Sequence, residues 1–141
     1  MSEALGDPRV QRFLATKHVV VLATVRPDGG PMARAMWFMH GADDLAMISL
    51  AATPKVEHLR RDPRVCVVAE TGTTSDIRNV TVLGRAVFLD DSPERRGLVE
   101  RFHAKYAPAL ERLWRGRAMP PDRVMFRIVP ERVLSHGLGD S

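Results

Sequence analysis

The sequence is poor in cysteine, in lysine and in long apolar runs. The shortage of cysteine and of apolar runs bears on the cellular compartment in which we expect the protein. Its one cysteine, Cys66, rules out an intrachain disulfide. Because Cys66 lies in an apolar stretch, we expect a buried, inert thiol and a reducing cytoplasm. No apolar run reaches the roughly 20 residues that a transmembrane helix needs, and the first ten residues have no signal-like apolar core. We therefore expect one cytoplasmic domain over residues 1–141 with no membrane contact.

Residue patterns typical of hydrolases, nucleotide-binding proteins and metalloenzymes are also missing. There is no G-x-S-x-G motif, no Walker loop and no G-x-G-x-x-G after an expected strand. The five histidines stand apart in the sequence, without the spacing of metal ligands. These absences argue against hydrolytic and metal chemistry. We expect no metal site and assign no catalytic residue.

Basic residues are plentiful, and 18 of the 21 are arginine, which gives a net charge of +4. A basic surface can bind nucleic acid. Here, however, the arginines alternate with acidic residues, as in Glu94-Arg95-Arg96 and Glu100-Arg101. This mixture favours a solvated, ion-paired surface with some contacts to acidic ligands. We expect no nucleic-acid partner.

Short β-type stretches separated by turn residues dominate the chain. We expect strands over residues 18–25, 32–40, 45–50, 64–70, 77–89 and 124–135, and helices that begin near Pro8, Pro54, Pro93 and Pro108. Tight turns join the first three strands, which predicts an antiparallel meander. Gly84, in the middle of the fifth strand, predicts a bulge or a close backbone approach. The fold class is α+β, a small β-barrel of six strands with flanking helices.

The stretch from Leu45 to Arg64 gathers groups that suit a phosphate. A strand ends in two alanines, and Thr53-Pro54-Lys55 then begins a helix, with Thr53 as the N-cap and Pro54 at the first helical position. Unpaired backbone N–H groups and Lys55 in the first turn favour an anion there. The same pattern also fits an ordinary capped helix with a solvated lysine.

The second expected strand adds further candidate ligand contacts. Arg34 suits a second phosphate contact because its planar fork matches phosphate oxygens, although a surface ion pair is an alternative. Alternation places Arg34 and Met36 on one face and Trp37 on the other. Trp37 fits either core packing or the wall beside a flat ligand. Asn79, on a later strand, fits a hydrogen bond to a ring carbonyl or simply the end of a strand.

Together these motifs resemble the pyridoxamine 5′-phosphate oxidase-like superfamily, whose members have the flavin-binding split β-barrel fold. The resemblance is carried by HVVVLATVRPDGGP from His18, by T-P-K-x-x-x-L-R-R-D-P-R-V from Thr53 and by NVTVLGRAVF from Asn79. The most similar subgroup comprises small actinobacterial-type proteins described as coenzyme F420-dependent (deazaflavin) reductases. The excess of arginine over lysine, typical of GC-rich genomes, favours the same subgroup.

The resemblance implies a homodimer that binds F420 or FMN at the interface between its subunits. By position, it assigns the ring contacts to Arg34, Ala35, Met36, Trp37, Ser49, Leu50 and Ala51, the phosphate contacts to Thr53 and Lys55, and one more cofactor contact to Asn79. Leu83 stands where the vitamin B6 oxidases have an acidic residue, and their C-terminal Trp and Arg pair is missing here. These departures argue against oxidation of vitamin B6.

The resulting hypothesis is an oxidoreductase that passes a hydride to a small conjugated organic substrate. Met36 and Trp37 would exclude water from one side of the ring, and the backbone of the strand over residues 45–50 would polarise its pyrimidine edge. Solvent or His136 would supply the proton. The alternative is a non-catalytic protein of the same fold that binds a flavin or a tetrapyrrole.

Overall fold

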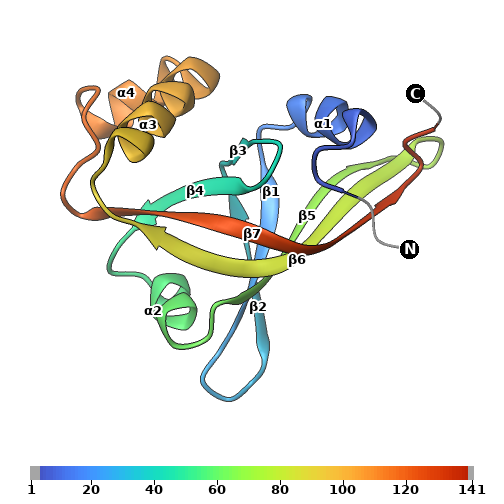
Figure 1. Cartoon of the computed structure of the whole chain (residues 1–141), viewed down its shortest axis with the longest axis horizontal. Coiled ribbons are helices and arrows are strands. Elements are labelled where there is room, and N and C mark those ends of the chain that lie inside the picture. Colours follow the sequence, from blue (N-terminus) through green and yellow to red (C-terminus); the bar gives the residue numbers. More distant parts are fainter. Residues whose placement is uncertain (1–3, 140–141) are drawn as a thin grey trace.

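The computed structural model describes residues 4–139, in which one curved sheet of seven antiparallel strands is flanked by four helices (Figure 1). The helices are α1 (Pro8–Ala15), α2 (Pro54–Arg61), α3 (Pro93–Tyr106) and α4 (Ala109–Trp114). The strands are β1 (Val20–Val25), β2 (Pro31–Met36), β3 (Met39–His40), β4 (Leu45–Leu50), β5 (Arg64–Gly72), β6 (Ile77–Leu89) and β7 (Arg123–His136). Their hydrogen-bonded order is β2-β1-β5-β6-β7-β4-β3, so β2 and β3 form the two edges.

Local sequence explains where the helices start and stop. The helices α1, α2 and α3 each begin with proline, whose missing N–H costs nothing at that position. Asp7 caps α1 by accepting from the backbone N–H of Arg9 at 2.8 Å, and Ser92 caps α3 in the same way. Pro63 prevents α2 from continuing, and β5 starts at the next residue. The expected starts of these helices are confirmed.

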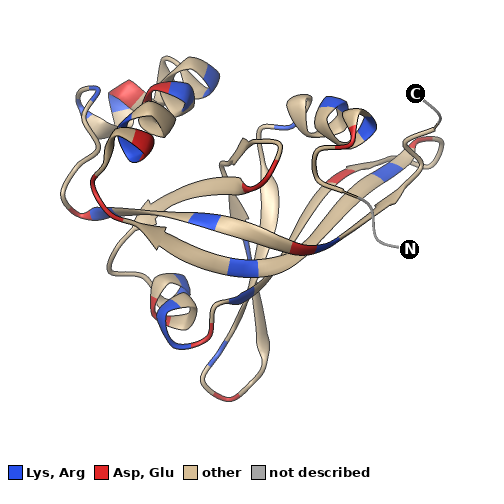
Figure 2. Cartoon of the chain, in the orientation of Figure 1, with Lys and Arg blue, Asp and Glu red and all other residues tan. Residues whose placement is uncertain are grey.

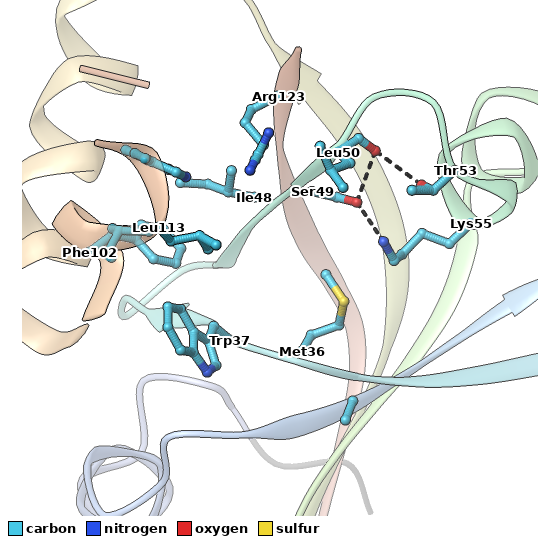
Figure 3. A pocket seen from close by; sticks show the side chains of 13 residues that line it. Met36, Trp37, Ile48, Ser49, Leu50, Thr53, Lys55, Phe102, Leu113 and Arg123 are labelled. Atoms are coloured by element: carbon cyan, nitrogen blue, oxygen red, sulfur yellow. Dashed lines mark hydrogen bonds between the residues drawn. The ribbon is translucent and has the colours of Figure 1, made fainter. Parts of the chain in front are cut away.

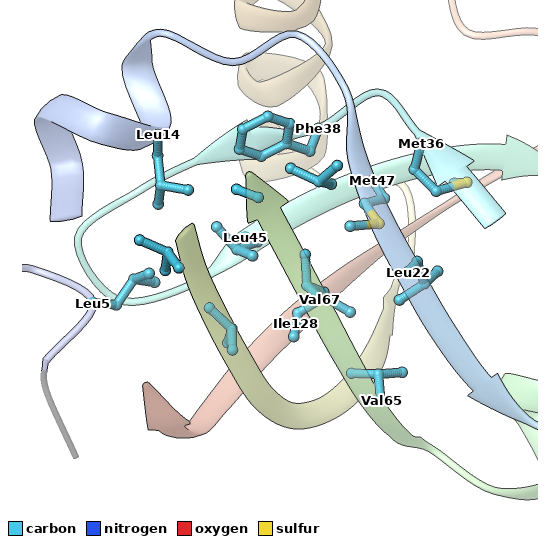
Figure 4. Close-up of a cluster of buried hydrophobic side chains, with 14 of the residues drawn as sticks. Leu5, Leu14, Leu22, Met36, Phe38, Leu45, Met47, Val65, Val67 and Ile128 are labelled. Carbon is cyan, nitrogen blue, oxygen red and sulfur yellow. The ribbon is translucent and has the colours of Figure 1, made fainter. Parts of the chain in front are cut away.

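Two clusters of buried side chains hold the molecule together. The larger one fills the curved sheet and is covered by α1 at one end; it includes Leu14, Leu22, Phe38, Leu45, Met47, Val67 and Ile128 (Figure 4). The smaller one lies between the opposite face of β4 and β7 and the pair α3 and α4, and includes Ala46, Phe102, Tyr106, Leu110, Trp114 and Met125. Successive residues of β4 alternate between the two clusters, as the period of a strand requires.

Gly84 sits at an irregularity where the register of β6 against β7 shifts between Leu83 and Gly84. A Cβ atom at Gly84 would lie 2.2 Å from the carbonyl oxygen of Val129, so no other residue fits without moving the backbone. The predicted bulge or close approach is therefore confirmed.

The structure corrects the strand predicted over residues 32–40, and with it the predicted number of six strands. The chain leaves the sheet at Trp37 and Phe38, so that β2 and β3 are separate strands and the sheet has seven. Tyr106 fixes this break, because its hydroxyl accepts from the backbone N–H of Phe38 at 2.8 Å and lies 2.9 Å from the carbonyl oxygen of Phe38. Hydrogen bonds from one buried side chain thus replace those of a continuous strand.

The meander predicted for the first three strands is also wrong. The β1–β2 hairpin forms as expected, but β4 pairs with β7 over its whole length and with β3 over two residues. Connections between the first strands are short enough for a meander. Here the break after Met36 carries the chain away from β2 and across the curved sheet (Figure 1).

Acidic and basic residues are interspersed over the helices and strands in Figure 2. Several form ion pairs, such as Arg117 with Glu100 at 2.6 Å and Arg96 with Asp91 at 3.0 Å. The mixture predicted from the sequence is present in the structure. It gives no single basic stripe along the elements drawn in that view.

Candidate functional site

A cavity of about 380 Å³ lies where the sheet fails to close, between β2 and β4 (Figure 3). β2 pairs only with β1, and β4 beyond Ala46 pairs only with β7, among the residues that the structure describes. The facing edges of both strands therefore present backbone N–H and C=O groups without a strand partner. Buried groups of this kind need hydrogen bonds. A ring with polar atoms along one edge could therefore bind in the gap and hydrogen-bond to these backbone groups.

One end of the cavity carries groups that suit an anion. The side chain of Lys55, in the first turn of α2, donates to Ser49 Oγ on β4 (Figure 3). Thr53 is the N-cap by position, but its hydroxyl donates to the carbonyl oxygen of Leu50 at 3.0 Å and leaves α2 without a side-chain cap. The first N–H groups of α2 thus remain available beside a cation, which is the usual arrangement of a phosphate site.

The electrostatics of Lys55 favour the same ligand. Burial lowers the pKa of the Lys55 ammonium, and the nearby positive charge of Arg34 lowers it further. Both effects penalise the protonated lysine, and a bound anion would relieve them. Arg34 lies in a depression that adjoins the main cavity and is lined also by Met32, Pro54 and Lys55. Two cations and a helix N-terminus therefore converge on one place.

The rest of the cavity is apolar, with three aromatic side chains. Its walls are Met36 at the end of β2, Trp37 just after it, Ile48 and Leu50 on β4, and Phe102, Leu110, Leu113 and Trp114 on α3 and α4 (Figure 3). The Trp37 ring stacks on Tyr106 at 4.4 Å between centroids and 6° between planes. Burial raises the pKa of Tyr106 to about 12, so its hydroxyl keeps its proton and its hydrogen bonds at neutral pH. Tyr106 thus holds Trp37 in place as a rigid wall.

A family model described as pyridoxamine 5′-phosphate oxidase matches residues 7–137. The chain belongs to this family. The resemblance of the T-P-K and N-V-T-V motifs to the superfamily is thereby confirmed, as are the α+β class and the partly open barrel. No curated protein sequence matches the chain.

Solved structures of similar proteins support the same fold. The conserved hypothetical protein Rv2991 from Mycobacterium tuberculosis is 27% identical, with a TM-score of 0.78 over 94% of this chain and 84% of its own. A putative pyridoxamine 5′-phosphate oxidase from Listeria innocua is 28% identical, with a TM-score of 0.72 over 90% of this chain and 94% of its own. A protein from Mesorhizobium loti described as FAD-binding is 23% identical, with a TM-score of 0.69 over 89% of this chain and 87% of its own. The last likeness shows the fold alone.

Most site residues predicted from the sequence meet at one cavity of this family member. Seven of them line it, namely Ala35, Met36, Trp37, Ser49, Leu50, Thr53 and Lys55, and Arg34 lines the adjoining depression. Ala51 does not line the cavity; its backbone N–H donates to the carbonyl oxygen of Asp122 at 2.8 Å. Asn79 is elsewhere, in the long β5–β6–β7 ladder, where it pairs with Glu70 and His136.

The sequence patterns did not indicate the walls supplied by α3 and α4, nor Arg123 at the start of β7. Leu110, Leu113 and Trp114 lie at helical spacing, which signals an apolar face. Nothing in that spacing says that the face covers the gap between two distant strands. Arg123 carries no motif at all, and only the pairing of β7 with β4 brings it to the cavity.

Residues 4–139 lack two further features. No three side chains among His, Cys, Asp and Glu are grouped so that they would hold a metal ion. No helix in the same range is both long enough and apolar enough to cross a membrane.

Proposed function

We propose that this protein is an oxidoreductase that binds F420 or FMN in the gap between β2 and β4. The observation that carries the proposal is the meeting of an uncapped helix start, Lys55 and Arg34 with an apolar, aromatic slot. A flat ring that bears a phosphate is the ligand that matches both halves. Family membership supports the same class of cofactor. When bound, the cofactor supplies hydride transfer, and the proposed acceptor is a small conjugated organic molecule.

The residues present fit such a cofactor. Lys55, Arg34 and the first N–H groups of α2 would hold the phosphate, as would the hydroxyl of Thr53 after a rotation away from Leu50. The unpaired edge of β4 from Met47 to Leu50 would bond the polar edge of the ring. Met36 and Trp37 would cover one side of the ring and exclude water from that side. No side chain in the cavity is an evident proton donor, so the proton would come from solvent.

The homodimer is part of the same proposal. On the outer face of the sheet Val21 is 38% exposed and Leu83 37%, and the ladder places Ala23, Cys66 and Leu83 side by side. Val21 also pairs with Ala35, which lines the cavity. An apolar face that reaches the rim of the site is suited to a second copy of the chain. Asn79, which lies outside its own cavity, would then contact the cofactor of the other subunit.

The first test is the affinity for the cofactor. Lys55→Ala should weaken binding of FMN or F420 by roughly ten- to a hundredfold, since a charge-assisted hydrogen bond contributes about 1.5–3 kcal/mol. Titrations followed by absorbance and fluorescence measure this directly. Lys17→Ala is the matched control, because Lys17 donates to Thr71 and lies over the Phe13 ring, outside the residues that line the cavity. Equal affinities for the wild type and Lys55→Ala would refute the assignment of the phosphate site.

The second test separates an enzyme from a carrier of flavin or tetrapyrrole. The protein is mixed with reduced deazaflavin or reduced FMN and a panel of enones, quinones and biliverdin, and reoxidation of the cofactor is followed. An oxidoreductase speeds reoxidation with at least one acceptor. Tight cofactor binding with no acceleration by any acceptor would favour the carrier. A parallel titration with haem tests the tetrapyrrole alternative.

A further inference from the structure

The cavity also has an apolar end, opposite the Lys55 end. Its far end lies under α4 and is lined by Phe102, Leu110, Leu113 and Trp114. Leu113 is 62% exposed and Leu50, also on the rim, is 47% exposed. Exposed apolar side chains at the rim of a cavity can contact a bound apolar molecule. This end is therefore a candidate contact surface for a second, apolar molecule.

A partly buried arginine stands at this apolar end. The Arg123 side chain is only 15% exposed, and its backbone pairs with Leu50 in the β4–β7 ladder. Its Nη1 donates to Asp122 Oδ1 at 2.6 Å, and no other side-chain hydrogen bond of Arg123 occurs within residues 4–139. Asp122 itself is 66% exposed. The remaining donors of the guanidinium fork are thus free to take a planar anion from the cavity.

We propose that this end binds the organic acceptor as a flat, apolar monocarboxylate, whose carboxylate is held by Arg123. The inference rests on the proposed oxidoreductase function, because it names the substrate of the same cavity. The guanidinium already pairs with Asp122 through Nη1. Its remaining N–H donors can bind one further carboxylate with two parallel hydrogen bonds. The cofactor phosphate is better matched by the other end, where Lys55, Arg34 and the start of α2 converge.

The order of residues along β4 places the acid next to the cofactor. Ser49, which accepts from Lys55, precedes Leu50, and Leu50 is opposite Arg123 on β7. In Figure 3 Trp37 lies across the cavity from Arg123, so a molecule held at Arg123 can extend toward Trp37 and the ring site. The aromatic walls select a flat molecule. A conjugated acid such as an arylacrylate has this shape and carries a double bond that can accept a hydride.

The test compares trans-cinnamate with neutral cinnamamide, which have nearly the same shape. Binding of each to the FMN-loaded protein is measured by titration calorimetry. The wild type should bind cinnamate at least tenfold more tightly than cinnamamide, and Arg123→Gln should remove that preference while affinity for cinnamamide is kept. Arg123→Lys, which keeps the charge without the fork, should give an intermediate preference. Arg112→Gln is the control, because Arg112 is exposed on α4 and does not line the cavity.

Each result decides between the two proposals. Equal affinity for acid and amide in the wild type, no binding of either, or an equal loss of both in Arg123→Gln would overturn the acid site. If FMN binds and any of these outcomes is found, the acid site is refuted while the proposed oxidoreductase function is retained. If FMN does not bind, the same titrations are made on the protein without FMN. A preference for cinnamate that depends on Arg123 then supports the acid site, while the proposed function fails.

Discussion

Lys105 places a positive charge in a half-buried position beside the break between β2 and β3. Its ammonium donates to the carbonyl oxygen of Phe38 at 3.0 Å and lies 3.7 Å from the centre of the Phe38 ring. Burial, with a smaller contribution from the charge of Arg101, lowers the pKa of Lys105 to about 8 from its ordinary 10.5. One side chain therefore makes stability depend on pH in a range where few groups titrate.

The direction of this dependence follows from proton binding. Between about pH 8 and 10.5 the unfolded chain holds a proton on Lys105 that the folded chain has released. Raising the pH through this range therefore favours the folded state. Relative to Lys105→Met, the free energy of unfolding of the wild type should rise from about pH 8 to pH 10, as measured by urea denaturation at several pH values. Tyr106 titrates in both proteins, so its effect cancels. A difference that does not change with pH would contradict this account.

At the residue scale, the sequence was informative wherever a side chain belongs to a local pattern. Thr53, Pro54 and Lys55 form a helix start whose tendency to bind anions depends on a few consecutive residues, and they lie where that pattern places them. Arg123 reaches the cavity only because β7 pairs with β4, more than 70 residues earlier in the chain. A contact between residues so far apart in the sequence produces no local sequence pattern that would predict it.

At the element scale, Gly84 shows how one close contact fixes the register of two long strands. Gly84→Ala should destabilise the protein by about 1–3 kcal/mol, because the new Cβ would overlap the carbonyl group of Val129. Gly97→Ala is the matched control: Gly97 lies within α3 with open space around it, and the change should stabilise the helix by about 0.5–1 kcal/mol. Urea denaturation of both variants checks the prediction. A loss of stability at Gly97 equal to that at Gly84 would mean that the close approach is not the cause.

The helices and most strands were predictable because their signals are local. Proline after a capping residue started three helices, and alternation of apolar residues identified β6 and β7. The strand predicted over residues 32–40 failed because its break depends on Tyr106, about 70 residues later. The position of β4 beside β7 rather than in a meander depends on the same break. Predictions therefore failed where distant side chains override local preference.

At the scale of the whole molecule, the outer face of the sheet tests the proposed dimer. Leu83→Lys should shift the protein from dimer to monomer and weaken cofactor binding at the same time, because it places a charge in the apolar face that adjoins the cavity. Val87→Lys is the control on the same strand, since Val87 is similarly exposed but lies beyond Arg85, where the pairing of β6 with β5 ends. Sedimentation velocity with and without cofactor measures both effects. A monomeric wild type would contradict the dimer.

The incomplete ladder between β2 and β4 has a mechanical consequence. In the described residues no hydrogen bonds between strands join β2 to β4. The two edges are connected instead through Trp37 and Phe38, which Tyr106 holds by stacking on Trp37 and by its hydrogen bond to Phe38. Local opening should therefore cost least there. A ligand that hydrogen-bonds to the free edges of both β2 and β4 would supply the missing connection between them. Ligand binding would then make the whole barrel more rigid, and the ligand-free protein would open locally first at its own binding site.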